Sequence, residues 1–190
     1  MNKSGLISGD EIFQTSLFSV EEHIDVRGSF SEVFQKTWQA CIDPVQWSVV
    51  KSEKNVLRGM HFHQRHDEYF HLISGHCLVG LKDIRPDSPT LGAHSLYEMF
   101  SSDMSVLVFP RGIIHGWFFY EPSIHLQAVS ESYLDYHEDD NHGCQWNAED
   151  LGIPWPITNP VLSDRSKNFE SVSDLLKLSK YRQNNCVNIS

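Results

Sequence analysis

Ligand-type side chains are concentrated in one short stretch of the sequence, RGMHFHQRHDEYFHLISG, at residues 58–75. Four histidines, an aspartate and a glutamate lie there between two glycines. Such side chains suit a metal site or an acid–base site, and in a chain with 11 histidines their clustering can also be chance. If residues 59–64 form a strand, its two-residue period places His61 and His63 on the same face. Glu68 follows a short polar turn and can face the same interior from the next strand.

A second motif, FPRGIIHGW, supplies His115 just after a turn that contains Pro110. Three imidazoles and one carboxylate that converge inside a small barrel suit Fe(II), Mn(II), Ni(II) or Zn(II), and the ligand types do not distinguish among these metals. We therefore predict a divalent metal site formed by His61, His63, Glu68 and His115. Five other histidines are assigned to the surface or to packing within strands: His66, His71, His94, His137 and His142.

Short strands are the elements that must position these side chains. Runs rich in Val, Ile, Phe and Tyr alternate with turn signals, and they include HLISG, HCLVGLKDI, SVLVFP, GWFFY and IHLQAVS. This spacing predicts an all-β antiparallel sandwich or barrel. Two stretches have helical character. One lies around QKTWQAC; the other is SDLLKLSKY, where Ser171 or Ser173 can cap the start.

Length and composition narrow the class of protein. The chain is expected to form one domain over residues 1–190, with a core at about residues 15–160. Residues 161–182 are expected to pack on this core, and residues 183–190 to be frayed. Lys and Arg number 15 against 25 Asp and Glu, a net charge of −10, and the absence of a basic run argues against nucleic acid.

The same composition carries expectations about location. No apolar run has the length of a signal peptide or a membrane span, so we expect no membrane partner. The four cysteines are widely spaced and form no CxxC pair, which is typical of reduced thiols in a cytoplasmic protein.

The four predicted ligands resemble the paired motifs of the cupin superfamily, which implies a cupin jelly-roll with a few short helices near the termini. A longer resemblance covers roughly residues 10 to 180. The blocks that carry it are DVRGSFSEVF, NVLRGMHF, DIRPDSPTLG, FPRGIIHGW, WNAEDLGIPWP and PVLSDRS. In order and spacing they resemble the dTDP-4-dehydrorhamnose 3,5-epimerase family, a nucleotide-sugar branch of the cupins.

This resemblance implies a metal-free isomerase that removes the proton alpha to a C4 ketone and reprotonates the carbon from the other face. It implies a homodimer with exchanged N-terminal strands and no organic cofactor. The family's base falls on His61, and its acid on Tyr133, or on Tyr136 if the count runs back from Trp146. The phosphate-binding arginines fall on Arg27 and Arg58, and the residue that contacts the nucleotide base falls on Gln46.

Some family positions are changed in this chain. The lysine that stabilises the enolate oxygen becomes Glu68, and the aspartate that holds the base becomes Ser166, with Asp164 two residues away. Because Glu68 and His63 complete the predicted metal set, a divalent cation can replace the lost ammonium. If His61 were a ligand, its lone pair would be committed, so Tyr133 or a metal-bound hydroxide would have to move the proton.

Three hypotheses follow from these residues. The first is a metal-assisted epimerase or isomerase acting on a nucleotide-linked 4-keto-6-deoxyhexose. The second is a metal-dependent, oxygenase-like cupin with a non-nucleotide substrate, and the third is a non-catalytic sugar-binding cupin. Affinity for a nucleoside diphosphate separates the first from the others, and metal content separates the second from the third.

Overall fold

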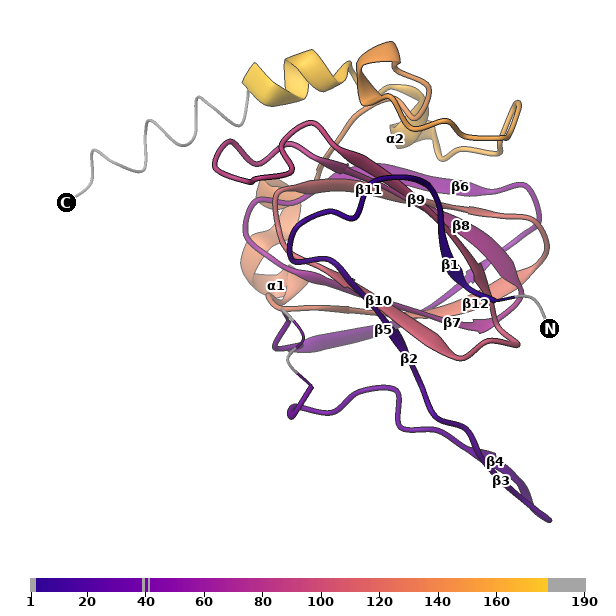
Figure 1. The fold of residues 1–190 in the computed structure, drawn as a ribbon. Coiled ribbons are helices and arrows are strands. Elements are labelled where there is room, and N and C mark those ends of the chain that lie inside the picture. Colours follow the sequence, from indigo (N-terminus) through magenta and orange to yellow (C-terminus); the bar gives the residue numbers. More distant parts are fainter. Residues whose placement is uncertain (1–2, 39, 41, 178–190) are drawn as a thin grey trace.

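The computed structural model describes residues 3–38, 40 and 42–177. Two antiparallel sheets face each other across a shared interior (Figure 1). The six-stranded sheet runs in the order β1 (Gly5–Gly9), β9 (His94–Phe100), β8 (His76–Asp83), β11 (Ile113–Phe119), β6 (Leu57–Phe62) and β13 (His142–Gly143). The five-stranded sheet runs in the order β2 (Ser16–Ser19), β10 (Ser105–Phe109), β7 (Glu68–Ser74), β12 (Ser123–Val129) and β5 (Gln46–Ser52). The predicted all-β jelly roll is confirmed.

Smaller elements lie around this sandwich. A hairpin of β3 (His23–Asp25) and β4 (Gly28–Phe30) projects away from the sheets (Figure 1). The short helices are α1 (Tyr133–Tyr136), η1 (His137–Asp140), η2 (Glu149–Leu151) and α2 (Asp164–Lys167). In the described part of the chain, no helix is both long enough and apolar enough to cross a membrane.

The two helix predictions have different outcomes. Residues 172–177 are helical, and Ser171 caps them by accepting a hydrogen bond from the Asp174 N–H (3.2 Å). The rest of SDLLKLSKY and the tail predicted to be frayed lie outside the described residues. The helix predicted at QKTWQAC is wrong for its described part, which forms only a turn at residues 36–38. There Trp38 stacks on Phe18 at 5.7 Å between ring centroids, and this packing prevails over the local helix propensity.

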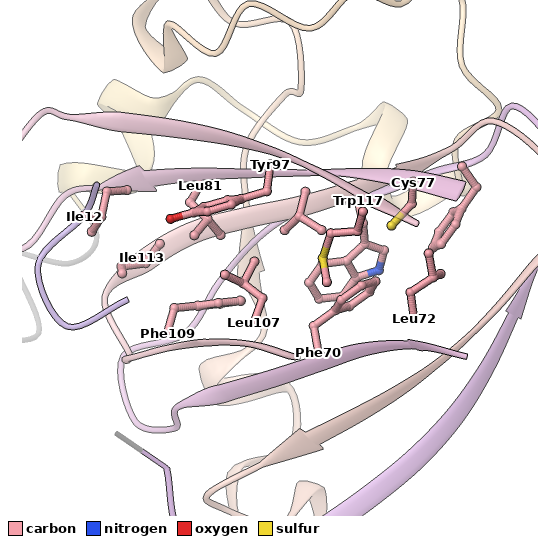
Figure 2. Packing of buried hydrophobic residues seen from close by; sticks show 13 residues of the cluster. Ile12, Phe70, Leu72, Cys77, Leu81, Tyr97, Leu107, Phe109, Ile113 and Trp117 are labelled. Atoms are coloured by element: carbon pink, nitrogen blue, oxygen red, sulfur yellow. The ribbon is translucent and has the colours of Figure 1, made fainter. Parts of the chain in front are cut away.

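Apolar side chains from both sheets fill most of the interior. Figure 2 shows Phe70 of β7 against Trp117 of β11, with Leu72 of β7 and Cys77 of β8 to one side of them. A second cluster lies on the outer face of the six-stranded sheet, where Leu57, Met60 and Phe62 pack under C-terminal residues that include Val172 and Leu175. Since Met60 and Phe62 face outward, the strand period directs His61 toward the interior.

Candidate active site

Three strands, β6, β7 and β11, bring the histidines and Glu68 together in this interior. His61 of β6 pairs in register with His115 of β11. His63 follows β6 directly, and Glu68 opens β7, where it pairs with Phe109. His63, Glu68 and His115 are all buried, with Glu68 only 2% exposed. The predicted convergence of these side chains is therefore seen in the structure.

One carboxylate oxygen of Glu68 is the centre of the arrangement. Glu68 Oε1 lies 3.3 Å from His66 Nε2, 3.6 Å from His63 Nε2 and 3.9 Å from His115 Nε2. Glu68 Oε2, in contrast, accepts a hydrogen bond from Gln127 Nε2 at 3.0 Å. We call His63, His66, Glu68 and His115 the histidine cluster.

The other ring nitrogen of each histidine in the cluster faces an oxygen. His63 Nδ1 lies 2.5 Å from the main-chain oxygen of Asp140, and His115 Nδ1 lies 3.1 Å from that of Ile113. His66 Nδ1 lies 3.3 Å from Asp140 Oδ2. We assign the Nδ1–H tautomer to His63 and His115, because only a donor suits those carbonyls. Their Nε2 lone pairs then point toward Glu68.

Burial and charge perturb the titration of these rings. Desolvation lowers the pKa of His63 and lowers that of His115 further. Burial also opposes the charged form of His66, but Asp140 and Glu68 outweigh it and raise the pKa of His66 to about 9. The 3.3 Å contacts of His66 are ion pairs whose alignment is too poor for hydrogen bonds. His66 thus favours the protonated form, whereas His63 and His115 beside it favour the neutral form.

His66 was assigned to the surface or to strand packing, and that assignment is wrong. It is 1% exposed and stacks on Tyr136 at 4.4 Å between ring centroids. The polar turn before Glu68 folds inward because Asp67 accepts hydrogen bonds from Arg111 (3.0 and 3.1 Å) and Ser130. His71, in contrast, packs within its strand as predicted, with Nδ1 2.9 Å from the Ser105 carbonyl.

Asp140 is the residue that sequence reasoning missed entirely. It is fully buried, and its carboxylate accepts hydrogen bonds from the main-chain N–H groups of Gln64 (2.7 Å) and Arg65 (2.9 Å). Asp140 also contacts both histidines: its main-chain oxygen lies next to His63 Nδ1, and its carboxylate lies next to His66 Nδ1. No sequence signal links positions that lie 76 residues apart.

His61 stands beside the histidine cluster. Its ring centroid lies 5.9 Å from that of His115 and 6.4 Å from that of His63. The group of described residues whose ligand atoms lie within 4.8 Å of one another contains His63, His66 and Glu68. Neither His61 nor His115 belongs to it, but His115 Nε2 lies 3.9 Å from Glu68 Oε1. Desolvation, with His63 next, lowers the pKa of His61 to about 3, so the ring is neutral. Of the four predicted ligands, His61 is the one that stands apart.

The family's lost His–Asp pair is not rebuilt nearby. Ser166 is buried and shares a hydrogen bond with Ser163 at the start of α2 (2.9 Å between the two Oγ atoms). Asp164 is almost fully exposed and pairs with Lys167. Instead, the edge of Phe169 meets the His61 ring at 6.4 Å between centroids. His61 therefore has Phe169 as an aromatic neighbour, while Ser166 and Asp164 have other partners.

Both candidate tyrosines belong to α1. Tyr133 is 41% exposed, and its N–H donates to Gln46 Oε1 at 2.9 Å, so the structure brings these two predicted site residues together. Tyr136 is buried against His66. Burial, followed by the charges of Glu68 and Asp140, raises the pKa of Tyr136 to about 12.

The two predicted phosphate-binding arginines have different surroundings. Arg58 is half-buried, and it donates to Ser52 Oγ (2.8 Å) and to the Lys51 carbonyl (2.9 Å). Within the described part of the chain, no carboxylate forms an ion pair with it. Arg27 is exposed, pairs with Asp25 and lies on the projecting hairpin, away from the interior of its own chain (Figure 1).

Comparisons with known proteins bear directly on this site. A model of the dTDP-4-dehydrorhamnose 3,5-epimerase family matches residues 10–174. The dTDP-4-dehydrorhamnose 3,5-epimerase of Salmonella typhimurium is 33% identical over 150 residues, which cover 73% of this chain and 80% of that protein. The Shigella flexneri enzyme of the same name is 29% identical over 168 residues, which cover 86% and 91%.

A solved structure extends the likeness to three dimensions. The dTDP-4-dehydrorhamnose 3,5-epimerase of Bacillus anthracis, with TDP and PPi bound, superposes with a TM-score of 0.78 at 28% identity. The match covers 88% of this chain and 99% of that one.

Together, the jelly roll and these matches define an isomerase of the nucleotide-sugar epimerase class. The chain belongs to the dTDP-4-dehydrorhamnose 3,5-epimerase family. The family, the fold and the enzyme class predicted from the sequence motifs are all confirmed.

Proposed function

We propose that this protein epimerises a dTDP-linked 4-keto-6-deoxyhexose by removing a proton alpha to the C4 ketone. The observation that carries the proposal is the position of His61. It occupies the base position of a chain that matches the family over residues 10–174, faces the interior and stands apart from the histidine cluster. An uncommitted imidazole can accept the carbon-bound proton.

Tyr133 is the proposed acid that returns a proton to the opposite face of the carbon. Its side chain is exposed at the start of α1, and its main-chain N–H donates a hydrogen bond to Gln46 Oε1. Tyr136 is the alternative, but its buried ring stacks on His66 and suits a role in packing. We expect Tyr133→Phe to slow product formation far more than Tyr136→Phe, while proton loss to His61 continues.

The diphosphate is proposed to bind at Arg58. A half-buried guanidinium without a carboxylate partner in the described part of the chain is suited to phosphate oxygens. The bound TDP in the Bacillus anthracis structure agrees with a nucleotide site on this fold. Gln46 is proposed to contact the base, next to the tyrosine that it already supports.

A homodimer completes the proposed substrate site. The β3–β4 hairpin exposes Ile24, Val26 and Phe30, which are apolar side chains that a partner would cover. Arg27 lies between them on the same hairpin and would reach the diphosphate in the partner. A nucleotide-sugar substrate and the unpaired thiols of Cys77 and Cys144 support a cytoplasmic location.

Metal assistance is the finer part of the proposal. The family's lysine position holds Glu68, so this position carries a negative charge in place of the ammonium. The donors of the histidine cluster suit a divalent transition metal by type: two imidazoles and a carboxylate lie within 4.8 Å of one another, and His115 approaches the same carboxylate. Such an ion would supply the positive charge that stabilises an enolate oxygen. His61 and Tyr133 would still carry the proton.

The test follows solvent exchange by NMR. The wild type, incubated in D₂O with a dTDP-4-keto-6-deoxyhexose, should incorporate deuterium at C3, at C5 or at both. His61→Asn should reduce the exchange rate by about 10²–10⁴-fold. His71→Asn is the matched control, because that buried histidine packs within β7 against the Ser105 carbonyl. A wild type that exchanges no proton would overturn the proposal.

The histidine cluster also supports a second candidate, an oxygenase-like metal enzyme with a non-nucleotide substrate. Calorimetric titration with dTDP distinguishes the two. Binding of dTDP that is weakened by Arg58→Ala supports the epimerase, whereas a protein with no affinity for dTDP favours the second candidate.

A further inference from the structure

We propose that His63, His66, Glu68 and His115 together bind one divalent transition-metal ion, that Asp140 positions two of the imidazoles, and that His61 lies outside the ligand set. This inference names the site on which the metal assistance in the proposed function rests. It differs from the sequence prediction, which placed His61 among the ligands and His66 outside them.

The polar atoms around Glu68 are short of hydrogen-bond donors. Glu68 Oε1, His66 Nε2 and His115 Nε2 are buried and have no hydrogen-bond partner in the described part of the chain. The His63 and His115 rings turn lone pairs toward the carboxylate, because their N–H groups already face carbonyls. Buried acceptors that face one another repel, and a cation among them removes the repulsion.

The distances between the ligand atoms also bear on metal binding. A metal bonded to nitrogen or oxygen ligands at about 2.0–2.2 Å holds neighbouring ligand atoms roughly 3.0–3.5 Å apart. From Glu68 Oε1, the Nε2 atoms of His66, His63 and His115 lie at 3.3, 3.6 and 3.9 Å. The ligand atoms of His63, His66 and Glu68 all lie within 4.8 Å of one another, whereas His115 lies outside that group and has to move further than the other three to complete the coordination.

Asp140 holds two of the proposed ligand histidines in place. Asp140 accepts two main-chain hydrogen bonds from Gln64 and Arg65, which fixes the segment between His63 and His66. Its main-chain oxygen and its carboxylate then contact the Nδ1 atoms of those two histidines. Metal-ligating histidines are commonly held in this way by a carbonyl or a carboxylate.

A proton on His66 is the competing explanation. It would give His66 ion pairs with Asp140 and Glu68, but it would leave His115 Nε2 buried without a donor. One metal ion satisfies Glu68 and all three Nε2 atoms at once. It also leaves the lone pair of His61 free for the proton transfer that is proposed for it.

The experiment measures metal content in untagged protein by elemental analysis, as purified and after chelation and reloading with Fe(II), Mn(II), Ni(II) or Zn(II). The wild type should hold about one ion per chain. His66→Asn should weaken binding by roughly 100-fold or more, and Asp140→Asn by about 10–100-fold. His61→Asn and His71→Asn should keep the wild-type stoichiometry.

Thermal melting provides a second measurement of metal binding and shows whether each variant is folded. The wild type and His61→Asn should melt at a higher temperature with metal than without it, and His66→Asn should show no such rise. The inference is overturned if the wild type binds none of the four metals. It is also overturned if His61→Asn loses the ion as completely as His66→Asn does.

The same samples separate this inference from the proposed epimerase. A metal-free wild type that still exchanges substrate protons in D₂O would overturn the metal site and leave the epimerase standing. A wild type that holds one ion but exchanges no proton would overturn the epimerase and leave the metal site standing.

Discussion

Asp83 and Glu68 are two buried carboxylates of the same sandwich, and their surroundings differ sharply. Asp83 accepts five hydrogen bonds, from the Arg85 N–H, the Arg85 Nε and Nη2 atoms, Ser88 and Thr90. Glu68 accepts one, from Gln127, and its other oxygen faces three imidazoles. The chain supplies five donors to Asp83, whereas Glu68 Oε1 has no hydrogen-bond donor among the described residues and faces nitrogen atoms that suit a shared cation. The contrast separates a carboxylate that stabilises the fold from one placed for a ligand.

Asp83→Asn should have the largest effect on stability. The substitution removes the charge that Arg85 neutralises in the loop after β8, and an uncompensated buried partner costs about 3 kcal/mol. Urea denaturation of the metal-free protein measures the loss in the free energy of unfolding. A loss as small as that caused by Glu68→Gln would remove the distinction between the two carboxylates.

Metal binding should stabilise the wild type by a similar amount through Glu68. At a free metal concentration 100 times the dissociation constant, the free energy of unfolding should rise by about 2.7 kcal/mol. Glu68→Gln should abolish this gain, because the amide cannot provide an anionic ligand. Asp83→Asn is the matched control, and it should keep the full metal-dependent gain despite its lower starting stability.

Without metal, Glu68→Gln should change the free energy of unfolding by no more than about 1 kcal/mol. The amide of the new side chain brings donors to a place where Glu68 Oε1 had none. Chemical denaturation in the presence of a chelator measures the change. A loss of several kcal/mol would show that Glu68 already has a full set of partners within the chain.

Acid should affect the Asp83 network within a defined pH window. Burial raises the pKa of Asp83, but the hydrogen bonds from Arg85, Ser88 and Thr90 outweigh burial and lower it to about 2. Its contribution to stability is therefore present above the unfolded-state pKa near 3.8 and is lost as the pH falls toward 2. The difference in stability between wild type and Asp83→Asn should be constant above about pH 5 and should shrink below pH 4. A constant difference down to pH 2 would contradict this account.

Sequence reasoning could predict the parts of the site that depend on the two-residue period of a strand. The positions of His61, His63 and His115 follow from alternation along β6 and from the turn before β11. The inward turn of His66 could not be predicted, because it depends on Asp140, which lies far away along the chain. The helix at QKTWQAC failed for a similar reason, since the long-range contact between Trp38 and Phe18 decides that segment.

Arg27 shows another limit of reasoning from one chain. The motif that contains it is plain in the sequence, but its hairpin projects from the sandwich (Figure 1), so its proposed contact with phosphate depends on a second chain. The changed family positions were also readable from the sequence. Their common consequence, a carboxylate oxygen that faces three imidazoles and has no hydrogen-bond donor among the described residues, required the distances around Glu68.

Anomalous diffraction from crystals of the metal-loaded wild type tests the central claim most directly. The account predicts one peak at the histidine cluster, bonded to the Nε2 atoms of His63, His66 and His115 and to Glu68 Oε1, with the His61 ring unbound. A cluster without a peak, or a peak bonded to His61 in place of His66, would contradict it.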